Sequence, residues 1–158
     1  MIRIIGIGSP FGDDAAGLIA ARRLAAAPPP GTEVIEADRP GATLIELLDG
    51  ADAVILIDAA HTGAPPGTLH DLDLYDLPRN PIALVSSHDL GVVEALRLAT
   101  VLGRAPARGR VLAIEVGSLE KAPQACSAVA RAASEYAVRR ARYWAEELRA
   151  LTVESYAD

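Results

Sequence analysis

The sequence is poor in cysteine, with one residue, Cys126, in 158. A single thiol cannot form an internal disulfide, and it cannot supply the thiolates of a cysteine-based zinc site. An unpaired thiol is typical of a reducing compartment, so we expect a cytoplasmic protein. Because Cys126 lies among alanines, we interpret it as a packing residue and not as a nucleophile.

Long apolar runs and clusters of basic residues are also absent. No segment approaches the roughly 20 apolar residues of a membrane span, and the N-terminal run is too short for a signal peptide. Acidic residues outnumber Lys and Arg by 21 to 15, and no basic stretch resembles a nucleic-acid patch. We therefore expect a soluble protein that has neither a membrane nor a nucleic acid as its partner. We also expect it to be a monomer.

Aromatic residues are few, since the chain has one Phe and one Trp although 51% of it is hydrophobic. The core must therefore consist of Ala, Leu, Val and Ile, which suits helices packed on an apolar sheet. The length is that of one ordinary domain, and no linker or repeat interrupts it. We expect residues 1–158 to form a single domain.

Short aliphatic runs alternate with helical patterns along the chain. The runs predict strands at residues 2–8, 33–37, 53–58 and 110–116, with a weaker edge strand at 68–74 and a short strand or loop at 83–85. Helices are expected at about residues 14–26, 44–48, 87–102 and 123–151. This order predicts an α/β fold with three layers, in which a twisted, mainly parallel sheet of about five strands carries helices on both faces.

Polar residues follow the predicted strands where ligands gather in such folds, at the carboxyl edge of the sheet. Asp13 and Asp14 come after the first strand, Asp58 ends the third, and His88 lies at the mouth of the third helix. Two carboxylates and an imidazole form a three-ligand set with open positions, which suits nickel or zinc. Asp14, Asp58 and His88 are therefore a candidate metal site.

Each of these residues has a plainer interpretation. An Asp at the start of a helix is often only a cap, and Ser86 with Asp89 fits a capping box. A cap does not explain His88, which we expect to stay neutral because the helix dipole disfavours its protonated form. His61 could approach the same edge but is more naturally a solvated loop residue, and His70 is expected to be exposed on the edge strand.

The glycine turn after the first strand also permits a dinucleotide interpretation. Gly6, Gly8 and Gly12 lie between a strand and a helix, and Asp38 ends the second strand, where a ribose-binding acid would stand. The glycine spacing differs from the dinucleotide motif, however, and Asp13 and Asp14 would repel a pyrophosphate at the helix N-terminus. A non-catalytic metal- or nucleotide-binding protein remains the alternative to an enzyme.

Five segments resemble the conserved blocks of the hydrogenase maturation proteases. Residues 6–17 (GIGSPFGDDAAG) are similar to the N-terminal signature of that family. The other four segments are residues 54–60 (VILIDAA), 66–68 (PGT), 87–91 (SHDLG) and 118–120 (SLE). They occur in the family's order and cover nearly the whole chain.

The resemblance implies an aspartic-type endopeptidase with a twisted α/β fold. Its expected partner is the nickel-loaded precursor of a nickel–iron hydrogenase large subunit, from which it removes a C-terminal extension. Asp14, Asp58 and His88 match the catalytic and metal-binding residues, and Asp13 and Asp38 are weaker candidates for substrate binding. The nickel would be transient and supplied with the precursor, and the attacking nucleophile is unassigned.

The sequence departs from the family pattern at several positions. Ser9 stands where Asn is usual, in a turn one residue shorter than in many members, and residues 39–43 (RPGAT) replace a glycine-rich stretch. No departure removes a metal ligand. They do leave open a peptidase of the same fold that has a substrate other than a hydrogenase.

Overall fold

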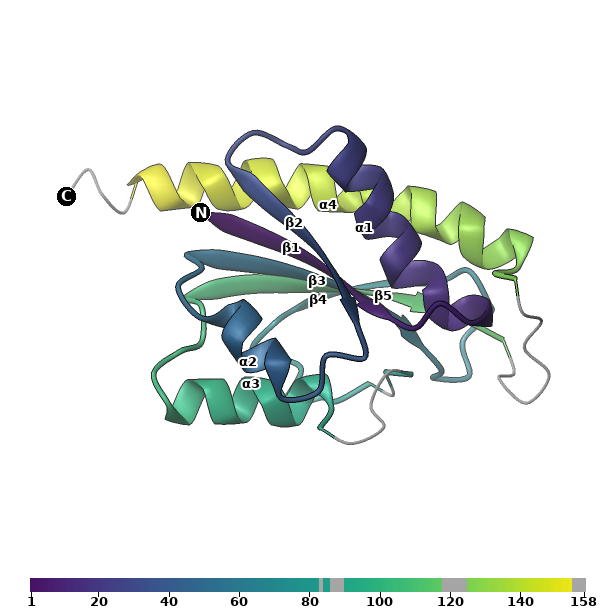
Figure 1. Ribbon diagram of the computed structural model, residues 1–158, viewed down its shortest axis with the longest axis horizontal. Coiled ribbons are helices and arrows are strands. Elements are labelled where there is room, and N and C mark those ends of the chain that lie inside the picture. Colours follow the sequence, from purple (N-terminus) through teal and green to yellow (C-terminus); the bar gives the residue numbers. More distant parts are fainter. Residues whose placement is uncertain (83, 86–89, 118–124, 155–158) are drawn as a thin grey trace.

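A five-stranded sheet forms the centre of the computed structural model, which describes residues 1–82, 84–85, 90–117 and 125–154. Its strands are β1 (Ile2–Gly8), β2 (Thr32–Asp38), β3 (Ala53–Ala60), β4 (Leu69–Asp73) and β5 (Arg108–Glu115). They lie in the order β2-β1-β3-β5-β4, and only the edge strand β4 runs antiparallel to its neighbour (Figure 1). Every residue of the central strand β3 is buried, as the apolar run at residues 53–57 predicts.

Two helices cover each face of the sheet (Figure 1). α1 (Ala16–Ala26) and α4 (Ala128–Glu154) pack on one face, and α2 (Thr43–Leu48) and α3 (Val92–Val101) pack on the other. The two hydrophobic clusters on either side of the sheet are mainly aliphatic, which confirms the predicted three-layer α/β architecture. Among the helices of the described residues, none combines the length and the hydropathy that a membrane span needs.

A stripe of alanines lets α4 lie close to the sheet and to α1. The stripe repeats every three or four residues, at Ala130, Ala133, Ala137, Ala141 and Ala145, all of which are buried. Ser134 joins this face, and its hydroxyl donates to the carbonyl oxygens of Ala16 and Ala130. The beginning of α4 is thereby fixed beside the beginning of α1.

Glycines bring α1 onto the carboxyl ends of the two central strands. A Cβ atom on Gly17 would lie 2.2 Å from the carbonyl oxygen of Ile7 and 2.5 Å from that of Ile57. A Cβ on Gly6 would lie 2.2 Å from the carbonyl oxygen of Gly17. Any side chain at these positions would push the helix away from the sheet, so the glycines fix where the segment before α1 can lie.

The strand predictions are confirmed within a few residues, but two helix starts are wrong. α3 begins at Val92, because Gly91 is extended with φ −75° and ψ 172° and Leu90 is not helical. The predicted start near Ser87 is therefore not observed, and the helix-dipole argument for a neutral His88 loses its basis. α4 begins at Ala128 and not near Pro123, since residues 125–127 are not helical. In the predicted segment 83–85, Leu84 forms one isolated antiparallel bridge with Ala60.

Candidate active site

Asp14 lies in a short 3-10 helix, η1 (Gly12–Ala15), between β1 and α1. The backbone N–H of Ser9 donates to the carbonyl oxygen of Asp14 at 3.3 Å. A Cβ on Gly8 would lie 2.0 Å from that same oxygen, so only glycine fits at the end of β1. The close approach holds the backbone of Asp14 against the carboxyl end of the strand.

One carboxylate oxygen of Asp14 has no hydrogen-bond partner among the residues that the structure describes. Its Oδ1 atom is buried and makes no hydrogen bond in the described part of the chain. Leaving a buried acceptor unsatisfied costs about 1–3 kcal/mol, and more when the group is charged. Native proteins keep few such groups, and an acceptor oxygen aimed at a site for a cation is one explanation for them.

Asp58 lies at the same edge of the sheet. It is 1% exposed, and its Oδ1 accepts a hydrogen bond from the backbone N–H of Ala59 at 2.8 Å. Asp58 follows Ile57, which pairs with Gly6 of β1, and η1 contacts the ends of both strands. The strand continues to Ala60, two residues further than predicted. The structure thus brings Asp14 and Asp58 to one edge, as the sequence predicted.

His88, with Ser86, Ser87 and Asp89, lies outside the described residues. Its place in the site and the capping box therefore stay predictions. Within the described ranges, no three His, Cys, Asp or Glu side chains are arranged to hold a metal ion. Asp14 and Asp58 are the two members of the predicted set that the structure describes.

Asp13 connects the first loop, which is the segment between β1 and α1 (residues 9–15), to the start of α4. Its carboxylate accepts hydrogen bonds from the backbone N–H of Ser127 at 2.7 Å and from the Ser127 hydroxyl at 2.9 Å. The hydroxyl oxygen of Ser127 in turn accepts from the N–H of Ala130 at 3.2 Å, as an N-cap does. Asp13 therefore has a structural role, and its part in substrate binding stays a prediction.

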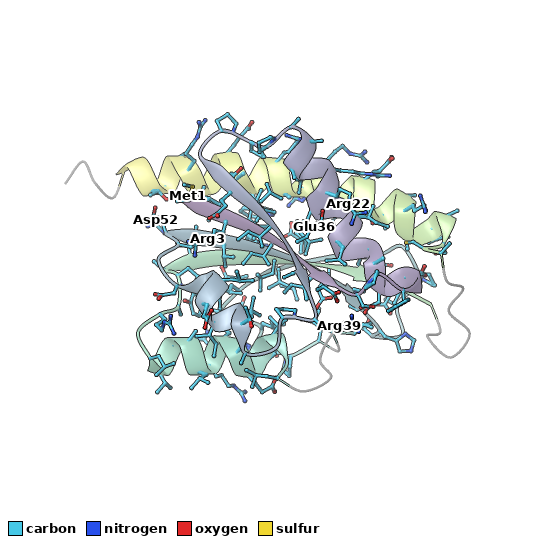
Figure 2. The ribbon with its side chains drawn as sticks, in the orientation of Figure 1. Met1, Arg3, Arg22, Glu36, Arg39 and Asp52 are labelled. Carbon is cyan, nitrogen blue, oxygen red and sulfur yellow. The ribbon has the colours of Figure 1, made fainter. Side chains whose placement is uncertain are left out.

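Asp38 forms an exposed ion pair with Arg39, whose Nε lies 2.7 Å from Asp38 Oδ1. This hydrogen bond lowers the pKa of Asp38 and raises the pKa of Arg39, which the charge of Asp14 raises further. Arg39 has a φ of 44°, rare for a residue with a side chain, and its N–H donates to the carbonyl oxygen of Gly8 at 2.8 Å. Figure 2 shows Arg39 at the opposite end of the sheet from Met1, Arg3 and Asp52.

Sequence reasoning missed Arg39 and its neighbour Phe11 as candidate site residues. The Arg39 guanidinium lies 6.0 Å from the centre of the Phe11 ring, and that ring is 63% exposed. An exposed aromatic ring beside a cation, next to Asp14, is suited to contact with a polypeptide. A positive φ at an arginine leaves no signal in the sequence, so this pair could not have been found there.

Glu115 is a second residue that the sequence analysis missed. It is 1% exposed at the end of β5 and accepts hydrogen bonds from four donors. The donors are Thr62 N at 2.8 Å, Thr62 Oγ1 at 2.8 Å, Gly63 N at 3.1 Å and His70 Nε2 at 3.0 Å. Burial by itself raises the pKa of Glu115, but the hydrogen bonds outweigh it and hold the pKa below its usual range. An acid ending an apolar strand was the signal that could have revealed it.

The structure changes the interpretation of His70 but agrees with that of His61 as a solvated loop residue. The side chain of His70 is 22% exposed and paired with Glu115, so the prediction that it is exposed was wrong. His61 is exposed in the loop after β3, and its Nδ1 lies 3.4 Å from the carbonyl oxygen of Val116. Glu115 therefore fixes the loop that follows the strand of Asp58.

Cys126 packs against the hydrophobic cluster under α1 and α4, as predicted. Burial raises the pKa of its thiol, and the nearby charge of Asp13 raises it further. A raised pKa disfavours the thiolate, which is the reactive form. Cys126 is thus a packing residue.

Comparison with known proteins gives the family of this chain. Residues 20–142 match the family model described as hydrogenase maturation protease. The chain is 28% identical over 156 residues to the hydrogenase expression/formation protein HupD of Rhodobacter capsulatus, covering 93% of this chain and 74% of that one. The protein belongs to the hydrogenase maturation protease family, a family of endopeptidases.

Solved structures of similar proteins have the same fold. The hydrogenase maturating endopeptidase HybD from E. coli superposes with a TM-score of 0.81 at 22% identity, over 92% of either chain. The nickel–iron hydrogenase maturation protease HybD from Thermococcus kodakarensis gives a TM-score of 0.73 at 22% identity, over 90% of this chain and 97% of that one. The predicted fold class is thereby confirmed.

Proposed function

We propose that this enzyme removes the C-terminal extension of a nickel–iron hydrogenase large-subunit precursor after nickel insertion. Asp14, Asp58 and His88 would recognise the nickel that the precursor carries. The observation that supports this most directly is the buried Oδ1 of Asp14, which makes no hydrogen bond within the described residues. Membership of the family supports the kind of partner.

The donor chemistry of the proposed set fits nickel. Two carboxylates and an imidazole are ligands of a borderline divalent ion, and three ligands leave positions for the groups that already hold the metal in the precursor. Binding the seated nickel would bring the scissile peptide bond against Asp14 and Asp58, a proximity effect. The metal is thus part of the substrate. By contacting the nickel, the enzyme would distinguish a loaded precursor from an unloaded one.

Peptide hydrolysis at this edge would need a water molecule and a proton acceptor. We propose that the carboxylate of Asp14 or Asp58 accepts a proton from the attacking water, in keeping with an aspartic-type enzyme. The peptide C–N bond breaks, the mature subunit ends in a new carboxylate, and the released extension carries a new amino group. The proposed setting is the cytoplasm, with the enzyme acting as a monomer.

Residues around the two acids would hold the polypeptide on either side of the bond. Asp38 and Arg39 offer an exposed pair of opposite charges, and Phe11 offers an exposed apolar surface. Asp13 would act here by keeping the first loop in place through Ser127. This arrangement suits an extended peptide lying across the carboxyl ends of the strands.

Processing of the precursor by site variants tests the proposal. Asp58→Ala and His88→Ala should each abolish release of the extension, followed by mass spectrometry, while circular dichroism shows an unchanged fold. Glu146→Ala is the matched control, since Glu146 is an exposed acid far along α4. Processing retained in both site variants would overturn the site. Failure of the unaltered enzyme on its cognate loaded precursor would favour a different substrate or a binding role.

A further inference from the structure

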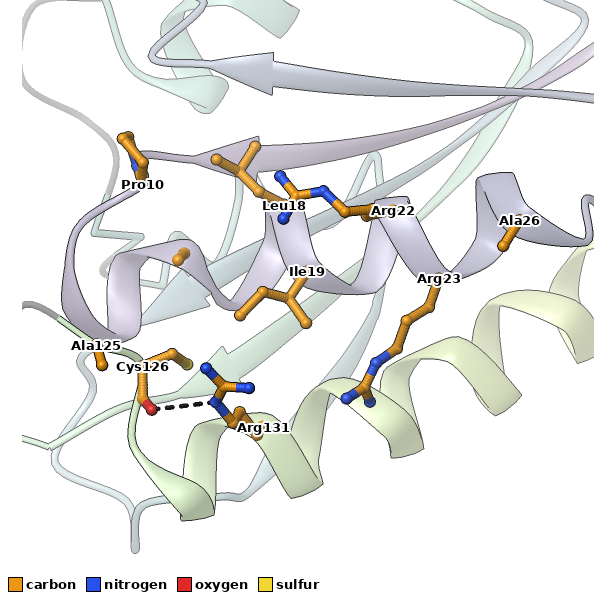
Figure 3. A pocket seen from close by; sticks show the side chains of 10 residues that line it. Pro10, Leu18, Ile19, Arg22, Arg23, Ala26, Ala125, Cys126 and Arg131 are labelled. Carbon is orange, nitrogen blue, oxygen red and sulfur yellow. Dashed lines mark hydrogen bonds between the residues drawn. The ribbon is translucent and has the colours of Figure 1, made fainter.

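A cavity of about 570 Å³ lies beside the first loop, between α1 and the start of α4 (Figure 3). Its apolar lining comes from Pro10, Ala15, Leu18, Ile19, Ala26, Ala125 and Cys126. Pro10 and Ala15 flank Asp13 and Asp14 in the chain, so the cavity adjoins the segment that carries these two acids. Its size lies within the range of ligand-binding pockets.

Three arginines line this cavity, although the chain as a whole has a net charge of −6. Arg22 donates two hydrogen bonds to Glu36 of β2, at 3.2 and 2.8 Å. Arg23 forms an ion pair with Glu135, in which its Nη1 lies 3.0 Å from Oε1. The charges of Arg22 and Arg23 are thus largely balanced by acids of the protein.

Arg131 differs from the other two arginines of the cavity. Its Nε donates to the carbonyl oxygen of Cys126 at 3.3 Å, which fixes the side chain at the start of α4. Figure 3 shows its guanidinium projecting into the space between α1 and α4, beside Ile19 and Cys126. In the described part of the chain, no carboxylate forms an ion pair with Arg131. Its terminal nitrogens remain available as donors for an anionic group.

We propose that this cavity binds the C-terminal end of the precursor's extension. The terminal carboxylate would accept hydrogen bonds from Arg131, and an apolar side chain next to it would pack against Ile19 and Cys126. The terminal carboxylate of a peptide and the apolar side chain next to it are thus complementary to the Arg131 guanidinium and to the apolar residues beside it. The inference rests on the proposed function, because the substrate must then extend from the acids at the strand ends past Pro10 into the cavity.

Binding is tested first without any catalysis, through the single cysteine of the chain. Cys126 lines the cavity, so a bound peptide should slow its alkylation by N-ethylmaleimide, followed by mass spectrometry. The probe is the tripeptide acetyl-Ala-Ala-Leu with a free carboxylate, and its C-terminal amide is the comparison. We expect at least tenfold weaker protection by the amide, and similarly weak protection in Arg131→Gln. Arg139→Gln, an exposed arginine of α4 outside the cavity, should behave like the unaltered protein.

Equal protection by the acid and the amide, or full protection in Arg131→Gln, would overturn the proposal. Kinetics on the loaded precursor supply the second test. Arg131→Gln should raise KM about fivefold or more and leave kcat unchanged, because it removes binding to a part of the substrate distant from the reaction. Peptide protection without any precursor cleavage would contradict the proposed function but not the cavity. Cleavage with an unchanged KM in Arg131→Gln would contradict the cavity alone.

Discussion

Gly17 of α1 lies directly against Ile57 of β3, the residue before Asp58. A Cβ atom at Gly17 would lie 2.5 Å from the carbonyl oxygen of Ile57, well inside van der Waals contact. The segment that carries Asp14 is thus held against the strand that carries Asp58. The separation of the two acids depends on this contact between a helix and a sheet.

Replacing Gly17 with alanine should therefore harm both the fold and the site. The new methyl group forces α1 away from the ends of β1 and β3, and overpacking of this kind costs about 1–3 kcal/mol. We expect the free energy of unfolding in urea to fall by that amount and precursor processing to fall with it. Gly117→Ala is the control, because its Cβ would meet no atom of the described residues nearer than 3.9 Å. Equal stability of both variants would show that the helix does not need this close approach.

Asp14→Asn should separate stability from activity. The buried Oδ1 of Asp14 has no hydrogen bond within the described residues, so losing the negative charge removes the cost of burying it, at the expense of an attraction to the exposed Arg39. We expect an unfolding free energy that is equal or about 1 kcal/mol higher, together with loss of processing. Thermal unfolding and the processing assay measure the two effects. A large loss of stability in this variant would mean that the carboxylate serves the fold.

The acid stability of the protein should depend on Glu115. Its pKa lies below that of an unfolded glutamate, so its contribution to stability is present above the unfolded pKa of about 4.3. Below the unfolded pKa the unfolded state binds a proton that the folded state does not, so the contribution declines. It is lost once the pH has fallen through the lower folded pKa. Urea unfolding between pH 7 and pH 3 should therefore show a declining free energy.

Glu115→Gln tests this assignment to one residue. The amide can still accept hydrogen bonds but does not titrate, so the free energy should be lower at pH 7 and should decline less on acidification. Asp71 accounts for part of the remaining slope. Its burial raises its pKa, but hydrogen bonds from Trp144, Arg140 and Arg110 outweigh the burial and lower the pKa. If the free energy of unfolding of Glu115→Gln declined on acidification as steeply as that of the unaltered protein, the assignment to Glu115 would be contradicted.

The contact between Asp13 and Ser127 should stabilise the beginning of α4. Asp13→Ala removes the hydrogen bonds to Ser127, and Ser127→Ala removes the helix cap itself. Each replacement should cost about 1–2 kcal/mol. Because both residues belong to one hydrogen-bonded unit, the double variant should lose less than the sum of the single losses. Additive losses in chemical unfolding would show that the two residues act independently.

Much of the fold could be predicted because its signals are local. The unbroken apolar run of β3 and the alternation of strands with helices define a buried parallel sheet, and that sheet places Asp14 and Asp58 at one edge. The start of α3 was missed because the serines and the acid at 86–89 resemble a cap, whereas the extended backbone of Gly91 decides where the helix begins.

The remaining features of the site depend on contacts between distant segments. Glu115 meets Thr62, Gly63 and His70 only once β5 lies between β3 and β4. The place of Arg39 beside Asp14 results from a positive φ at a residue that seldom adopts one. Neither the contacts of Glu115 nor the place of Arg39 depends on a fixed spacing along the chain, so a sequence pattern could not have predicted them.

The most direct test of the proposed function compares two forms of the cognate large-subunit precursor. One form is loaded with nickel and the other lacks it, and mass spectrometry follows the loss of the C-terminal extension from each. If Asp14, Asp58 and His88 recognise the seated metal, only the loaded precursor is cleaved, and Asp14→Asn cleaves neither. Equal cleavage of the two forms would contradict the recognition of nickel by this site.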